Sequence, residues 1–288
     1  NNGIQEYTQT GNTINSTTPI PYGAGTRPET ETARDIVVDG NNQIFVYNGT
    51  SRPFLSTYNS STNSWTQTTH PSWSTVNNVS YGGLAKFDNF VYATDMNTPQ
   101  DPPRGIVRFD LDNNTSQRYA DNFEYIDVTM GLDGVLYGLR EDANAAGRTV
   151  DAYDPLTMYS LWTTTLPNDT KGIAIAQNGE IFTAGADGTI YHYNSDGTPL
   201  NSKASGSNNL TDIDVSFDGK LALGSGIGQV IVTDQSLNNV SSFSAGNTPT
   251  FVSFSTYQTP DAILDPTATV NLSVSQVLTG IDYGAIAL

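Results

Sequence analysis

Short apolar runs and two-residue polar turns alternate along most of this chain, and the spacing of an amphipathic helix is absent. This pattern predicts an all-β protein built from hairpins. The turns recur at regular intervals, as Asp39-Gly40, Asp88-Asn89, Asp133-Gly134, Asn178-Gly179 and Asp218-Gly219. Successive turns lie 49, 45, 45 and 40 residues apart, close to the period of about 40–45 residues that four-stranded propeller blades show.

The third strand of each repeat ends in the same way, with an aromatic residue or threonine followed by Asp, Asn or Thr. This ending occurs at Tyr7-Thr8, Tyr58-Asn59, Phe109-Asp110, Tyr153-Asp154, Tyr193-Asn194 and Thr233-Asp234. Aligned on their second strands, the complete repeats put innermost strands near residues 33–38, 82–87, 126–131, 171–176 and 211–216. Five blades are thereby placed.

A sixth repeat is split between the two ends of the chain. Residues 4–8 and 13–18 would supply its third and fourth strands, and residues 250–255 its innermost strand. Such a blade locks the ring, because neither end can leave without exposing an unpaired strand edge. The sequence therefore predicts a six-bladed β-propeller over residues 1–266, with the terminal blade closed by N- and C-terminal strands.

Residues 267–288 are predicted to form a C-terminal strand or tail. Within them, residues 268–274 alternate apolar and polar positions, and they would be the second strand that the terminal blade lacks or an added one. Residues 278–284 are similar to the short strand that leads into a following immunoglobulin-like module in bacterial surface proteins. An ordinary closing strand is an equal alternative.

Composition limits the partners of this chain. Its 12 basic and 29 acidic residues give a net charge of −17, which repels nucleic acid and anionic membranes. Only 14% of residues are charged, and Asn, Ser, Thr and Gly supply the polar surface, as in many secreted β proteins. No apolar run is long enough to cross a membrane. We expect a bacterial extracellular or cell-surface protein that binds a glycan, a small molecule or a surface protein, without nucleic-acid binding or membrane insertion.

Three aspartates share one aligned position near the start of the innermost strand in alternate blades: Asp35, Asp127 and Asp212. In a six-fold ring they would face the axis roughly 120° apart and could hold a hard cation such as Ca²⁺ or Mg²⁺. The alternative is structural. Each carboxylate would then accept backbone N–H bonds from a neighbouring loop between blades and pair with a nearby cationic side chain.

Connections on the same face predict a ligand site at the mouth of the channel. Arg34 and Lys171 lie beside the aspartates in the alignment, while Tyr22 and Trp73 lie in connections where a flat ring could stack on a sugar. Two long loops, at residues 94–104 and 140–148, would wall this mouth.

The other aromatic and histidine residues receive different expectations. Trp65 and Trp162 fall on outer strands and are predicted to pack between blades. His192 is predicted to face outward from a third strand. His70 precedes Pro71 in a connection between blades, which makes it the histidine placed to act as a base if the protein is an enzyme.

Residues 171–184, Lys-Gly-Ile-Ala-Ile-Ala-Gln-Asn-Gly-Glu-Ile-Phe-Thr-Ala, resemble the repeat of NHL-type and streptogramin-lyase-like six-bladed propellers. Residues 211–224 and 34–47 resemble it less closely. The resemblance implies a fold and a range of functions, since that superfamily includes lyases, lactonases, peptidyl-glycine-processing enzymes and binding modules. Streptogramin lyases use His and Glu with a divalent cation, whereas this chain has 2 histidines.

We therefore expect an extracellular binding or interaction module, with its ligand at the channel mouth, rather than an enzyme. The alternative is a metal-assisted lyase or hydrolase of the streptogramin-lyase or lactonase type. In that case Asp35, Asp127 and Asp212 would hold the cation and His70 would be the base.

Overall fold

The fold is seen in a computed structural model. It describes residues 3–4, 7–10, 13–16, 20–21, 33–39, 43–48, 54–59, 62–69, 82–95, 104–141, 147–238, 241–245 and 250–254. All structural statements below concern these residues. None of them forms a helix that is long and apolar enough to cross a membrane.

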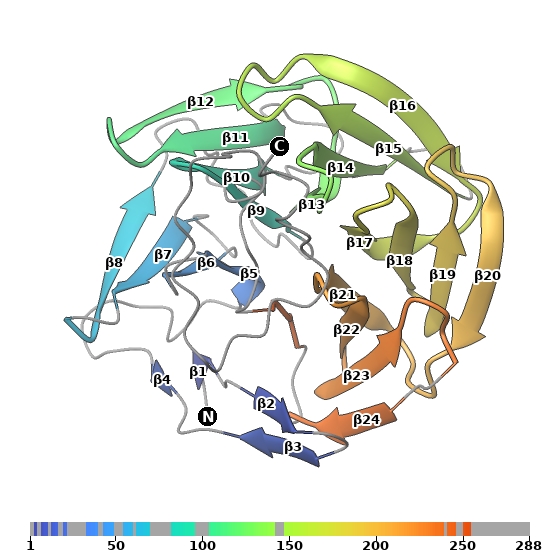
Figure 1. Cartoon of the computed structure of the whole chain (residues 1–288). Helices are drawn as coiled ribbons and strands as arrows, with labels where there is room; N and C mark the ends of the chain where they lie inside the picture. Colours follow the sequence, from blue (N-terminus) through green and yellow to red (C-terminus); the bar gives the residue numbers. More distant parts are fainter. Residues whose placement is uncertain are drawn as a thin grey trace, which may run out of the picture.

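Five four-stranded antiparallel sheets are arranged as the blades of a β-propeller (Figure 1). Blade 1 consists of β5 (Ala33–Val38), β6 (Ile44–Asn48), β7 (Phe54–Asn59) and β8 (Ser64–Thr69), and blade 2 of β9 (Leu84–Phe87), β10 (Phe90–Asp95), β11 (Gly105–Asp110) and β12 (Thr115–Tyr119). Blade 3 consists of β13 (Tyr125–Met130), β14 (Leu136–Glu141), β15 (Arg148–Tyr153) and β16 (Ser160–Leu166). Blade 4 consists of β17 (Thr170–Ile175), β18 (Ile181–Gly185), β19 (Thr189–Tyr193) and β20 (Pro199–Ala204), and blade 5 of β21 (Leu210–Val215), β22 (Lys220–Ser225), β23 (Gln229–Asp234) and β24 (Ser241–Ser244).

The prediction of a six-bladed ring is corrected to five four-stranded blades. The N-terminal strands form two small sheets instead, in which β1 (Gly3–Ile4) pairs with β4 (Ile20–Pro21), and β2 (Tyr7–Thr10) pairs with β3 (Thr13–Ser16). Both lie on the side of the ring between blades 5 and 1 (Figure 1). Pairing of strands close in sequence costs little loop-closure entropy, and Pro21 cannot donate to a longer ladder. The expected closing strand in residues 268–274 lies outside the described residues.

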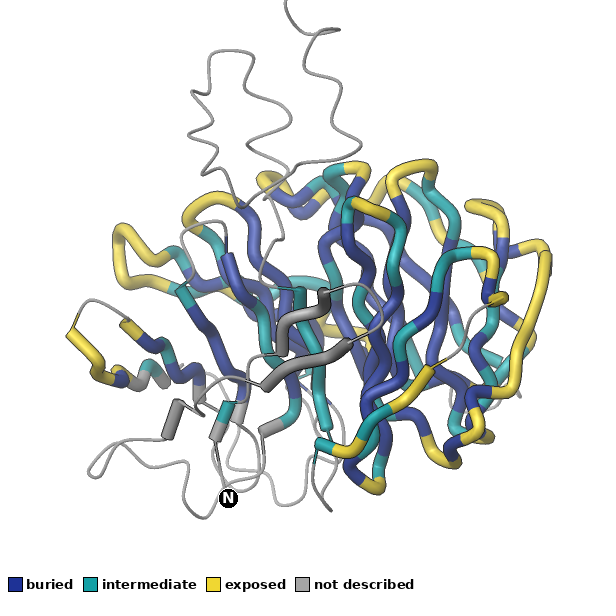
Figure 2. Tube along the Cα trace, turned by 60° about the horizontal axis from the view of Figure 1, so that its bottom comes forward, coloured by how far each residue is buried: buried dark blue, intermediate teal, exposed yellow. Residues whose placement is uncertain are grey.

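The antiparallel order of each blade defines two faces. Turns between first and second strands and between third and fourth strands lie on one face, called here the lower face. Turns between second and third strands and the connections between blades lie on the upper face. Figure 2 shows exposed segments concentrated at both faces, with buried strands between them.

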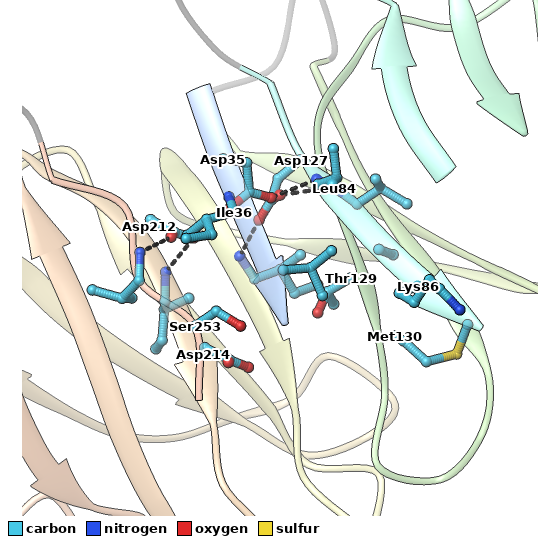
Figure 3. A pocket seen from close by; sticks show the side chains of 16 residues that line it. Asp35, Ile36, Leu84, Lys86, Asp127, Thr129, Met130, Asp212, Asp214 and Ser253 are labelled. Atoms are coloured by element: carbon cyan, nitrogen blue, oxygen red, sulfur yellow. Dashed lines mark hydrogen bonds between the residues drawn. The ribbon is translucent and has the colours of Figure 1, made fainter. Parts of the chain in front are cut away.

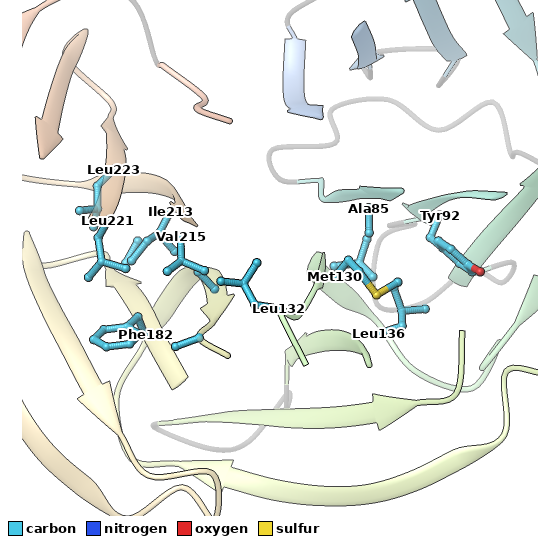
Figure 4. Close-up of a cluster of buried hydrophobic side chains, with 14 of the residues drawn as sticks. Ala85, Tyr92, Met130, Leu132, Leu136, Phe182, Ile213, Val215, Leu221 and Leu223 are labelled. Atoms are coloured by element: carbon cyan, nitrogen blue, oxygen red, sulfur yellow. The ribbon is translucent and has the colours of Figure 1, made fainter. Parts of the chain in front are cut away.

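The core lies between successive blades. Apolar side chains from inner strands of neighbouring blades pack together, including Tyr92 of blade 2, Leu136 of blade 3, Phe182 of blade 4 and Leu223 of blade 5 (Figure 4). All four side chains are fully buried. Sheets that bury both surfaces in this way account for the continuous apolar runs seen in the sequence.

Two tryptophans on outer strands support this packing, as expected. Trp65 is 6% exposed and its ring lies 5.1 Å from that of Tyr58, whereas Trp162 is only partly buried, 5.5 Å from Tyr137. Trp65→Ala should therefore lower the free energy of unfolding by about 3–5 kcal/mol. Trp162→Ala should cost less, because part of its indole already contacts water. Urea denaturation of both variants checks this order, and equal costs would contradict it.

Candidate functional site

The mouth of the channel is shaped by β-bulges at the start of the innermost strands. In blades 1, 3, 4 and 5 the first ladder skips one residue, and the skipped residues are Arg34, Ile126, Lys171 and Thr211. A bulge bends the strand and re-aims the side chain of the extra residue. Arg34 and Lys171, predicted to contact a ligand, thus leave the ladder at the upper end of the channel.

The residue after each of three bulges is one of the predicted aspartates. Asp127 accepts hydrogen bonds from the backbone N–H of Val128 (2.8 Å) and of Ile173 in blade 4 (2.8 Å). Asp212 accepts from Ile213 (2.8 Å) and from Val252 (2.7 Å).

Asp35 repeats the arrangement. Its carboxylate accepts from the N–H of Ile36 (2.6 Å) and from the N–H of Leu84 in blade 2. Each aspartate therefore bonds the next residue of its own strand with one oxygen and the following inner segment with the other. These are the backbone bonds of the structural interpretation, with donors beside the channel rather than in loops.

Blades 2 and 4 have a glycine where blades 1, 3 and 5 have an aspartate. A Cβ atom on Gly83 would lie 2.1 Å from the backbone nitrogen of Val128 and 2.2 Å from Oδ1 of Asp127. A Cβ on Gly172 would lie 3.0 Å from Cα of Asp212. The glycines therefore let blades 2 and 4 approach the aspartate strand of the following blade, so Asp and Gly alternate around the channel.

Four carboxyl groups line the central cavity, because Asp214 joins the three predicted aspartates (Figure 3). The cavity is about 30 Å³, room for about two water molecules. Asp214 accepts bonds from the N–H of Val215 and of Phe254, both 2.8 Å. The sequence could have indicated it, since two residues apart in a strand means one face of the sheet.

Burial raises the pKa of all four carboxyl groups. The pKa of Asp212 rises to about 7 and that of Asp214 to about 6, with removal from water as the main cause. The pKa values of Asp35 and Asp127 lie well above the ordinary range, mainly through burial and then through repulsion by neighbouring carboxylates, Asp212 among them. The channel thus favours protonated aspartates near neutral pH.

A cation in this ring would compete with hydrogen bonds that the aspartates already make. In the described part of the chain, no group of three or more His, Asp or Glu side chains is arranged to hold a metal ion. Both oxygens of each predicted ligand accept a backbone N–H, so direct metal coordination would require some of these bonds to break. The predicted Ca²⁺ or Mg²⁺ site stays a prediction.

The other predicted mouth residues are placed as follows. Lys171 donates from Nζ to Oδ1 of Asn209 (2.5 Å), and burial lowers its pKa. Arg34 is partly buried. Tyr22, His70 and Trp73 lie outside the described residues, as do residues 96–103 and 142–146 of the two long loops.

His192 does not face outward, contrary to expectation. Its ring stacks on Phe182 with centroids 4.2 Å apart, and Nε2 lies 2.9 Å from Oε2 of Glu180. Its strand neighbours Tyr191 and Tyr193 point to the other face of the sheet, so His192 must take the side occupied by Phe182. This histidine supports packing within blade 4.

Comparison with known proteins gives the fold class. No family model and no curated protein matches the chain. Solved structures do match: the Dos1 propeller (TM-score 0.52, 14% identity, 75% of this chain and 61% of that chain) and U3-55K (0.53, 12%, 73% and 63%). The PQQ-bound aldose sugar dehydrogenase from Streptomyces coelicolor also matches (0.56, 12%, 77% and 85%).

At such low identity these matches show the architecture alone. The chain is a β-propeller, and it spans less than two thirds of the Dos1 and U3-55K chains. Fold likeness does not transfer an activity, because one propeller scaffold carries many functions.

Proposed function

We propose that this protein is a binding module of the extracellular space or the cell surface, with its ligand at the upper mouth of the channel. The narrow channel is the observation that carries this proposal. Its cavity of about 30 Å³ is far below the roughly 300–1,000 Å³ of small-molecule sites. A glycan, a small molecule or a surface protein would therefore be held by groups on the upper face rather than inside the ring.

Arg34 and Lys171 come from blades on opposite sides of the channel (Figure 1). Both are bulge residues at the upper ends of their strands, and their cationic groups could donate hydrogen bonds to a ligand that spans the mouth. Tyr22 and Trp73 are proposed to stack on its apolar face. Rigid strands below would keep the two cations at a fixed separation.

The sequence resemblance to NHL-type propellers fits a ring that continues beyond blade 5. Val252 meets Asp212 through its N–H, as Leu84 meets Asp35 and Ile173 meets Asp127. We propose that residues 250–254 take the innermost place of a sixth unit, which the N-terminal strands β1 to β4 flank.

The alternative function is a metal-assisted lyase or hydrolase. The four carboxyl groups that line the channel favour it, because oxygen ligands suit Ca²⁺ and Mg²⁺. His70 would serve as the base. The hydrogen bonds that hold Asp35, Asp127 and Asp212 count against this alternative.

A thermal-shift panel of glycans, Ca²⁺ and Mg²⁺ separates the two functions. A glycan that binds at the mouth should raise the melting temperature of the wild type, equivalent to about 2.7 kcal/mol at 100 times its Kd. Lys171→Gln should reduce this shift. Lys203→Gln, which removes an exposed charge on β20, is the matched control and should retain it.

A shift that Lys171→Gln retains in full would contradict the proposed site, as would a panel without any glycan response. A rise with Ca²⁺ or Mg²⁺ that disappears in Asp127→Asn would support the metal-dependent alternative instead.

A further inference from the structure

Exposed apolar side chains gather on the lower face, away from the proposed ligand site. Of the large apolar residues that are exposed in the described chain, four lie at the lower ends of blades 3 and 4. They are Leu156 (52% exposed), Tyr159 (72%), Leu161 (48%) and Leu200 (47%). We call them the lower-rim patch. Its neighbours in sequence are mostly Asn, Ser, Thr and Asp, so the patch interrupts a polar surface.

Two of the four leucines and tyrosines are turned outward by the same backbone device. The outermost ladder of blade 3 skips Leu161, and that of blade 4 skips Leu200 at the equivalent place. The outermost ladders of blades 1, 2 and 5 have no such shift within their described residues. A bulge re-aims the extra side chain, so adjacent blades each direct one leucine to the solvent.

The hairpin turn that carries Leu156 and Tyr159 is held rigidly. Oδ1 of Asp154 accepts bonds from both N–H and Oγ1 of Thr157, each 2.7 Å. Met158 adopts a positive φ of 58° and is buried beneath the turn.

Blade 2 tethers the same turn from the side. Tyr92 donates from its hydroxyl to the carbonyl of Pro155 (2.6 Å), and the guanidinium of Arg108 donates to the carbonyl of Leu156. Leu156 and Tyr159 are therefore presented in a fixed geometry. Preorganised aromatic and aliphatic side chains lose little conformational entropy when a partner covers them.

The turns beside the patch carry negative charge at neutral pH. Hydrogen bonds from Thr157 lower the pKa of Asp154, and hydrogen bonds from Thr198 lower the pKa of Asp196. Both carboxylates belong to lower-face turns of the two blades that form the patch. The protein as a whole has a net charge of −17, so its long-range field attracts a cationic partner.

We infer that the lower-rim patch is a docking surface for a protein segment that presents apolar side chains next to Lys or Arg. The apolar residues would be covered by the patch, and the cationic ones would meet Asp154 and Asp196. A second copy of this chain fits poorly, because two such surfaces would bring like charges together. The inference is independent of the ligand site at the upper mouth.

Selection from a random-peptide phage library tests this surface directly. The wild type is the target, and a Leu161→Ser, Leu200→Ser double variant is used for counterselection. Both leucines are exposed, so folding should be retained. Enriched peptides should combine apolar or aromatic residues with Lys or Arg. As synthetic peptides they should bind the double variant at least about tenfold more weakly, and Asp196→Asn should weaken binding and its salt dependence.

Ile227→Ser is the matched control, since Ile227 is 56% exposed but lies in an upper-face turn of blade 5. It should bind the peptides as the wild type does. The inference is overturned if no peptide distinguishes the wild type from the double variant, or if the enriched peptides lack basic residues. Sedimentation that shows wild-type dimers, lost in the double variant, would assign the surface to a second copy and likewise overturn it.

Discussion

Acidification from about pH 8 to about pH 5 should stabilise this protein, whereas many proteins lose stability as their paired carboxylates are protonated. The reason lies in the four buried aspartates of the channel. The pKa of Asp212 rises from 3.8 to about 7 and that of Asp214 to about 6, while Asp35 and Asp127 are raised well above 3.8. A buried carboxyl group that prefers its proton binds it more tightly in the folded chain than in the unfolded one.

The direction of the effect follows from this difference. Below about pH 3.8 both states carry the proton and the stabilisation is complete, and it is lost as pH rises through the folded pKa values. Each pKa unit corresponds to about 1.4 kcal/mol, so the free energy of unfolding should fall by a few kcal/mol between about pH 5 and pH 8. Surface aspartates such as Asp154 and Asp196 have lowered pKa values and act in the opposite sense, but only at lower pH.

Urea denaturation as a function of pH measures this slope. Asp212→Asn should flatten it between about pH 5 and pH 8, whatever its effect on absolute stability, because an amide does not titrate. Asp196→Asn is the control. It removes one negative charge from the surface and should leave the slope unchanged. A wild-type profile that is level over this range, or an equal slope in Asp212→Asn, would refute the account of a protonated channel.

The blades could be predicted because their causes are local. Turns such as Asp133-Gly134 and Asn178-Gly179 have glycine at the positive φ that a tight hairpin requires, and the apolar runs between them have strand length. Strand positions in all five blades agree with the sequence to within about two residues. The number of blades could not be settled in this way, because it depends on which distant strands pair.

The aspartate ring could be predicted in part. Alignment placed Asp35, Asp127 and Asp212 at one level, since equivalent residues of a repeat take equivalent places. Their hydrogen-bond donors could not be found, because the N–H of Val252 reaches Asp212 only when the ring brings segments 40 residues apart together. Bulges at Arg34 and Lys171 likewise depend on packing between neighbouring blades.

Gly83→Ala should be among the most damaging single substitutions in the ring. The new Cβ would lie 2.1 Å from the backbone nitrogen of Val128 and 2.2 Å from Oδ1 of Asp127, much closer than non-bonded atoms allow. Backbone cannot swing aside as a side chain does, so blades 2 and 3 would have to separate and disturb the core between them. We expect a loss of about 3 kcal/mol or more in the free energy of unfolding, at the upper end of the range for overpacked cores.

Gly172→Ala provides the graded comparison, because Gly172 has the same place in blade 4. Its Cβ would lie 3.0 Å from Cα of Asp212 and 3.1 Å from the nitrogen of Ile213, so a shift of a few tenths of an ångström would accommodate it. Replacing glycine also restricts the unfolded chain, which returns about 0.4–1 kcal/mol. Urea denaturation should therefore show a small change for Gly172→Ala and a large loss for Gly83→Ala. If both variants unfold at the wild-type midpoint, the glycines are not needed for the close approach of blades, and the alternation of Asp and Gly around the channel has another origin.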